Sequence, residues 1–95
     1  MGLKNTTSCL GFQQITDLST AKALNVPTGA TAVLLQADAQ SVRWRDDGVD
    51  PTASIGMLIP PSSFVLVSFL YEGDLSKIRF IEASSGGILN VSYYA

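Results

Sequence analysis

The sequence predicts an all-β protein, a compact antiparallel β-sandwich or jelly-roll-like barrel of about eight short strands. Apolar and polar residues alternate in short segments, so that Val42 and Trp44 face one way from their strand and Arg43 and Arg45 the other. Turn residues separate these segments at intervals of roughly 8–12 residues. The connections are too short for crossovers between parallel strands, so the strands are expected to be antiparallel.

Helix signals are almost absent, which favours the same fold class. The one candidate helix, Thr16–Leu24, is too short to be stable alone and stops before Pro27. It is equally well explained as a loop followed by a brief strand at Ala21–Leu24. The first strand carries Gly11, a candidate β-bulge. That first strand is Leu10–Thr16, and the later ones are Thr31–Asp38, Gln40–Arg45, Ser54–Ile59, Phe64–Tyr71, Lys77–Glu82 and Ile88–Tyr94.

The length of 95 residues is that of a single domain. The loosely patterned residues 1–25 are expected to form an N-terminal arm that orders on docking, followed by a β-sandwich domain over residues 26–95. Hydrophobic residues make up 46% of the chain and charged residues 15%. This apolar balance argues against disorder and suggests that a partner covers some apolar surface.

Composition also excludes several classes of function. Six Lys and Arg residues against a net charge of −2 do not supply the basic surface that nucleic acids require. No apolar run approaches the length of a membrane span. The sequence contains no histidine and one cysteine, Cys9, so Ser-His-Asp and Cys-His catalysis and His/Cys zinc sites are not possible within the chain. We therefore expect no enzymatic activity, no cofactor and no small-molecule substrate.

Clustered carboxylates make Asp46, Asp47 and Asp50 weak candidates for a calcium site. Their spacing does not match the twelve-residue calcium loop, and no glutamate closes it. The alternative is that Asp46 and Asp47 shape the turn by bonding to the backbone and that Asp50 caps the turn at Pro51.

Two places are predicted to contact other protein subunits. The first is the strand Phe64–Tyr71, because both of its faces are apolar, whereas a small sandwich strand normally keeps one face wet. Coverage by the protein's own loops is the alternative to burial against a partner. The residues on the candidate contact face are Val65, Val67, Phe69 and Tyr71.

The second place is the polar corner that surrounds Trp44. Arginines on one strand face, followed by aspartates, can form bidentate ion pairs within the loop or across an interface. Trp44 is expected to anchor the core rather than serve as a ligand platform. The candidate contact residues here are Arg43, Arg45, Asp46, Asp47 and Arg79, the last of which is expected to join the same polar face.

The combination of several segments resembles small virion structural proteins encoded among the head genes of tailed bacteriophages. The segments are Val42–Gly48, Asp50–Ala53, Gly56-Met57, Asp74–Ile81 and Leu89–Tyr94. The resemblance implies a decoration or cement protein that is made in the bacterial cytoplasm and resides on the virion head. Its implied partners are the major capsid protein and copies of itself, as a trimer or dimer. A neck or tail component is the structural alternative.

The alternative from another class is a carbohydrate-binding module. Tyr71, Tyr93, Tyr94 or Trp44 would stack on sugars if exposed. Sugar platforms need aromatic side chains on a shared face, whereas the consecutive residues Tyr93 and Tyr94 are expected to point to opposite faces of their strand.

Overall fold

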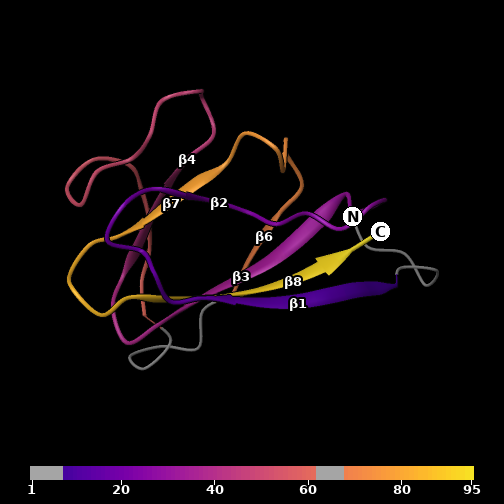
Figure 1. Cartoon of the computed structure of the whole chain (residues 1–95), viewed down its shortest axis with the longest axis horizontal. Helices are drawn as coiled ribbons and strands as arrows, with labels where there is room; N and C mark the ends of the chain where they lie inside the picture. The colour runs from indigo at the N-terminus through magenta and orange to yellow at the C-terminus, as the bar shows by residue number, and fades with distance from the viewer. Residues whose placement is uncertain (1–7, 62–67) are drawn as a thin grey trace.

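The computed structural model describes residues 8–61 and 68–95, and it confirms the all-β prediction. Eight strands form two four-stranded antiparallel sheets (Figure 1). Within the described ranges there is no helix, and hence none long and apolar enough to cross a membrane. The strands are β1 (Cys9–Ile15), β2 (Lys22–Ala23), β3 (Ala32–Asp38), β4 (Val42–Arg45), β5 (Met57–Ile59), β6 (Phe69–Tyr71), β7 (Arg79–Glu82) and β8 (Ile88–Tyr94).

The strand orders of the two sheets show that the strands pair in a nested way. Sheet A runs β1-β8-β3-β6, and sheet B runs β2-β7-β4-β5. The first strand therefore pairs with the last, the second with the seventh, the third with the sixth and the fourth with the fifth. Such nested pairing results when one long antiparallel hairpin is rolled over into two layers. It leaves β1 and β6 at the edges of sheet A and β2 and β5 at the edges of sheet B.

The hydrophobic core lies between the sheets and follows the alternation expected from the sequence. In β3 the inward residues Val33, Leu35 and Ala37 are fully buried, and from sheet B Val42 and Phe80 are fully buried opposite them. Loop residues close the ends of this core: Leu18, Leu24, Leu75 and Ile78. Because side chains alternate across each strand, the same pattern leaves one outward face on each sheet.

The described part of the predicted N-terminal arm belongs to the sandwich itself. β1 pairs with β8 from Cys9 to Ile15, and β2 pairs with β7. Ile15, Leu18 and Leu24 all lie in the core cluster, with Leu18 fully buried. The core therefore crosses the boundary predicted between residues 25 and 26. The physical reason is that β1 contributes only one of its seven residues to the buried core, so its sequence pattern is weak.

Several local predictions are confirmed in detail. Gly11 lies at an irregularity in the register between β1 and β8, as expected of a bulge. Of the two explanations of Thr16–Leu24, the structure has the loop followed by a brief strand, β2. The chain then turns at Pro27, where the Ala30 amide donates to the Pro27 carbonyl at 3.2 Å.

Three strands begin later than the sequence predicts because turns occupy their first residues. Ahead of β5, the amide of Ile55 donates to Thr52 Oγ1 at 3.0 Å, and this turn delays the strand to Met57. Ahead of β4, the Gln40 amide donates to the Asp38 carbonyl at 2.8 Å. Ahead of β7, the Lys77 amide donates to the Asp74 carbonyl at 3.1 Å. Half of the predicted strand Phe64–Tyr71, residues 64–67, lies outside the described residues, and its last three residues form β6.

Candidate interaction site

Trp44 lies on β4 of sheet B, beside the edge strand β5. It is half-buried and packs against the core cluster. Its indole stacks on Phe69 with ring centroids 5.3 Å apart, and it meets Tyr71 edge-on at 5.6 Å. This three-ring cluster joins β4 of sheet B to β6 of sheet A. Trp44 thus anchors the core as predicted, while its indole also lines a surface pocket.

The ring of Tyr71 contacts Trp44, and its hydroxyl is held by Asp46. The Tyr71 hydroxyl donates to Asp46 Oδ2 at 2.5 Å, and the tyrosine is 7% exposed. Burial raises the pKa of Tyr71 to about 12, and the hydrogen bond to the Asp46 carboxylate adds to this shift. Tyr71 was predicted as a partner contact. Its ring and hydroxyl are instead used inside the protein, so that prediction is corrected.

Arg45 and Asp47 form a bidentate ion pair within the loop. Arg45 Nε donates to Asp47 Oδ1 at 3.0 Å, and Arg45 Nη2 donates to Asp47 Oδ2 at 2.5 Å. The bond from Arg45 lowers the pKa of Asp47 to about 2 and raises that of Arg45. Both side chains are accessible to water, so the pair adds little stability. It does fix the orientation of two opposite charges at the rim of the site.

Arg43 and Gly56 together hold the returning chain against β4. Arg43 Nε donates to the Ala53 carbonyl and Nη1 to the Gly56 carbonyl, both at 3.0 Å. Gly56 has a φ of +143°, and a Cβ there would lie 3.1 Å from the Trp44 carbonyl oxygen and 3.2 Å from Arg43 Cβ. A side chain at position 56 would push the chain away from β4. Glycine thus permits the close approach that forms the wall of the pocket.

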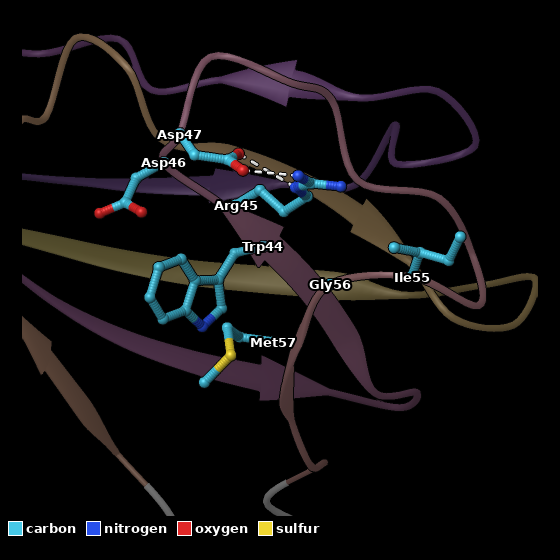
Figure 2. A pocket seen from close by; sticks show the side chains of 7 residues that line it. All are labelled: Trp44, Arg45, Asp46, Asp47, Ile55, Gly56 and Met57. Atoms are coloured by element: carbon cyan, nitrogen blue, oxygen red, sulfur yellow. Dashed lines mark hydrogen bonds and ion pairs between the residues drawn. The ribbon is translucent and has the colours of Figure 1, made fainter.

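The pocket formed by these elements has a volume of about 390 Å³ (Figure 2). Trp44 and Met57 are cross-strand neighbours, and Figure 2 shows their side chains beside each other below the charged rim. Ile55, Met57 and Leu58 are 57%, 61% and 49% exposed. A further hollow of about 240 Å³ shares Trp44 and Met57 and extends along β5 towards Phe69. The result is an apolar strip along the edge of sheet B.

The structure brings some of the predicted contact residues together and separates others. Arg79 lies directly opposite Arg45 in the pairing of β4 with β7, so it joins the polar face as expected. Its Nη1 donates to the carbonyls of Ser76 and Ile78, both at 3.0 Å. Phe69 is half-buried against Trp44, and Val65 and Val67 lie outside the described residues.

The three aspartates considered for calcium do not converge. Figure 2 shows the Asp46 carboxylate pointing away from the Arg45–Asp47 pair. Asp46 accepts the bond from Tyr71, Asp47 accepts those from Arg45, and Asp50 lies in a separate hollow with Lys77. Over residues 8–61 and 68–95, no three His, Cys, Asp or Glu side chains are close enough to hold a metal ion.

The predicted sugar-stacking residues are also dispersed. Tyr93 is 2% exposed and donates to Gln13 Oε1 at 2.6 Å. Tyr94 points to the opposite side of β8, as predicted, and its hydroxyl accepts a bond from Ser92 Oγ at 3.2 Å. Of the four candidate aromatic residues, Trp44 is the one that lines the pocket.

Ile55, Met57 and Leu58 are site residues that sequence reasoning missed. The segment was predicted as a strand, but nothing in its pattern shows that the strand lies at an edge. The available signal was the pair of prolines after Ile59, since proline limits strand pairing and is confined mostly to edges.

Comparison with known proteins gives no family assignment: no family model matches the sequence, and no curated protein or solved structure matches it.

Proposed function

We propose that this chain is a non-enzymatic structural protein of a phage virion, a decoration or cement protein that docks on the major capsid protein through the apolar edge beside Trp44. The observation that carries the proposal is the exposure of Met57 and Leu58 on the edge strand of sheet B and of Ile55 just before it, next to a pocket of about 390 Å³. Apolar side chains gathered at one exposed place indicate a contact with another protein.

The geometry suits docking of an extended segment from a neighbouring subunit. β5 pairs with β4 on one side, and over residues 8–61 and 68–95 it is the last strand of sheet B, with no strand paired on its other side. A segment added there would gain backbone hydrogen bonds and place an apolar side chain against Trp44 and Met57. The Arg45–Asp47 pair at the rim would favour one orientation of the partner.

The nested strand order supports the viral setting. Jelly rolls, which recur in viral capsid and lectin domains, also have eight antiparallel strands in two sheets, and the nested strand order is compatible with that arrangement. Fold alone does not establish function. The setting therefore rests on this order together with the resemblance of the Val42–Gly48 and Asp74–Ile81 segments to phage head proteins. A capsid also presents many copies of one surface, so a weak contact becomes an effective one.

The decisive experiment uses the assembled particle of the virus that encodes the chain. Particles lacking the protein are incubated with the wild type, with Met57→Lys and with the control Val49→Lys, and bound protein is measured after sedimentation. Val49 is 54% exposed but lies outside the apolar edge, so its variant is expected to bind like the wild type, whereas Met57→Lys loses binding. Absence of wild-type binding, or full binding by Met57→Lys, contradicts the proposal. Electron microscopy of the particle distinguishes a head position from a neck or tail position.

A second candidate, carbohydrate binding, is favoured by one observation. Trp44 shares its pocket with Arg45 and the carboxylates of Asp46 and Asp47, which combines a stacking ring with groups that hydrogen-bond hydroxyls. A glycan array tests it directly with the wild type and Trp44→Leu. Hits that depend on Trp44 support a sugar site, and an array without hits removes it.

A further inference from the structure

The outward face of sheet A is nearly free of charge. One row across the four strands runs Phe12, Ser92, Leu34 and Leu70, each opposite the next in the strand pairing. The neighbouring row has Gln14, Asn90 and Gln36, and the row on the other side has Tyr94 with Ala32. Among the described residues of this face, Asp38 at the end of β3 carries the single charge. It lies two rows from Phe12, roughly 14 Å away along the strands.

This face carries a protruding apolar side chain, Phe12, and a hollow beside it. Phe12 on the edge strand β1 is 67% exposed, the highest value among the large apolar side chains that the structure describes. Beside it a hollow of about 130 Å³ is lined by Phe12 itself, Leu34, Gln36 and Ser92, with Ser68 and Asn90. A cavity of about 150 Å³ accepts a benzene ring. The hollow is therefore close to the size of a phenyl group.

We propose that this face binds a second copy of the same chain, with Phe12 of each protomer seated in the hollow of the other. The inference goes beyond the proposed function, which assigns the capsid contact to β5, and gives the association with further copies of the chain a surface of its own. In an isologous interface the same surface of both protomers is in contact. Any charged side chain on that surface therefore lies near the identical charge of the partner, and the two repel each other. A face with one charge at its margin avoids this repulsion, whereas the arginine-bearing outer face of sheet B does not.

The strand order makes the two-fold arrangement possible. A two-fold axis that runs parallel to the strands and passes between β8 and β3 places β1 of one protomer over β6 of the other. Phe12 and Leu70 lie in the same row, so Phe12 then faces Leu70 and the adjoining hollow. Two sheets stacked in this way would pack with their strands within about 30° of each other and roughly 10 Å apart.

The size of the face predicts a weak, reversible dimer. Three strands of seven residues and one of three give a footprint of roughly 400 Å² per protomer, from strand spacings of about 4.8 Å and rises of about 3.4 Å. Stable interfaces bury about 800 Å² per partner. We therefore expect a dissociation constant in the micromolar range, which a multivalent shell would reinforce.

Analytical ultracentrifugation from about 1 µM to 1 mM tests the association. The wild type is expected to convert from monomer to dimer over this range, and Phe12→Ser to weaken dimerisation at least tenfold, because each dimer loses two phenyl rings. Val49→Ser is the matched control, since Val49 is 54% exposed but lies outside both the face of sheet A and the apolar edge of sheet B. A wild type that stays monomeric at 1 mM, or dimerisation that is unchanged in Phe12→Ser, overturns the proposal.

Cys9 provides a native probe of the geometry, because it is the only cysteine in the chain and is exposed near the same face. In the proposed dimer the two Cys9 positions lie about 17 Å apart, from about 14 Å across the strands and 10 Å between sheets. Nitroxide labels at Cys9, in a sample shown to remain dimeric, are expected to give separations of about 15–30 Å. Separations beyond about 40 Å would indicate an interface elsewhere and overturn the assignment.

The two proposals can fail separately. Phe12→Ser that is monomeric but still binds the particle leaves the capsid contact at β5 intact. A dimeric wild type that ignores the particle supports the face of sheet A and contradicts the proposed function.

Discussion

The hydroxyl of Tyr71 donates to the carboxylate of Asp46 at 2.5 Å and so connects the edge of sheet A to the loop that leaves sheet B. The two residues are 25 positions apart in the sequence, and the bond joins the two layers of the sandwich. It fixes the aromatic cluster from which Trp44 lines the pocket. The stability of the candidate site therefore depends on a contact between the two layers.

We expect Tyr71→Phe to destabilise the protein by about 1–2 kcal/mol, because it removes a hydrogen bond to a charged group while preserving the ring. Asp46→Asn keeps an oxygen that can accept the bond, so the loss of stability in this variant is expected to be smaller than in Tyr71→Phe. Urea denaturation followed by Trp44 fluorescence measures both. A loss for Asp46→Asn that exceeds that for Tyr71→Phe would show that the charge, rather than the bond, holds the two layers.

The ion pair at the rim predicts the titration of Asp47. Its pKa is lowered to about 2 by the bond from Arg45. A carboxylate whose pKa is depressed in the folded state stabilises that state above the unfolded value of about 4, and this contribution is lost as the pH falls towards 2. NMR titration of the side-chain carboxyl is expected to show the pKa of Asp47 rising towards 3.8 in Arg45→Gln. Arg43→Gln is the control and should leave it unchanged, because Arg43 bonds to backbone carbonyls instead.

Gly56→Ala tests the close approach at the pocket wall. The substitution adds a Cβ against the Trp44 carbonyl and Pro51 at a φ of +143°. We expect a loss of about 2–4 kcal/mol, from backbone strain together with overpacking. Gly48→Ala has a φ of +86° but no atom within 4 Å of the added Cβ, so it isolates the strain and should cost about 1–2 kcal/mol. Equal losses in thermal denaturation would mean that packing at position 56 is not tight.

Leu18→Ala tests whether the N-terminal segment belongs to the folded unit. Leu18 is fully buried in the core cluster, so we expect a loss of about 2–5 kcal/mol in the isolated protein. Leu10→Ala, at a side chain 38% exposed on β1, should cost about 1 kcal/mol or less. An unaffected Leu18→Ala protein would favour an arm that orders only on docking.

The sequence by itself determined the fold class and much of the core. Val33, Leu35 and Ala37 occupy every second position of their strand. They therefore share one face of the sheet, whatever the position of that strand in the sheet, and all three are buried. Turn chemistry located the loops, and alternation placed Arg43, Arg45 and Arg79 on one polar face. These features depend on local backbone geometry, which a short segment of sequence carries.

Tertiary structure decided which strands are neighbours and which are edges. The alternation of apolar and polar residues predicts which face of its strand a residue occupies, but not which strands lie next to it. It could not show that Tyr71 would be buried against Asp46 or that Met57 would lie at an edge. It also could not show that β1, with a single buried residue, is held by β8 from the other end of the chain. Contacts between residues distant in sequence depend on the whole chain, and at this site those contacts form both the pocket and the apolar edge.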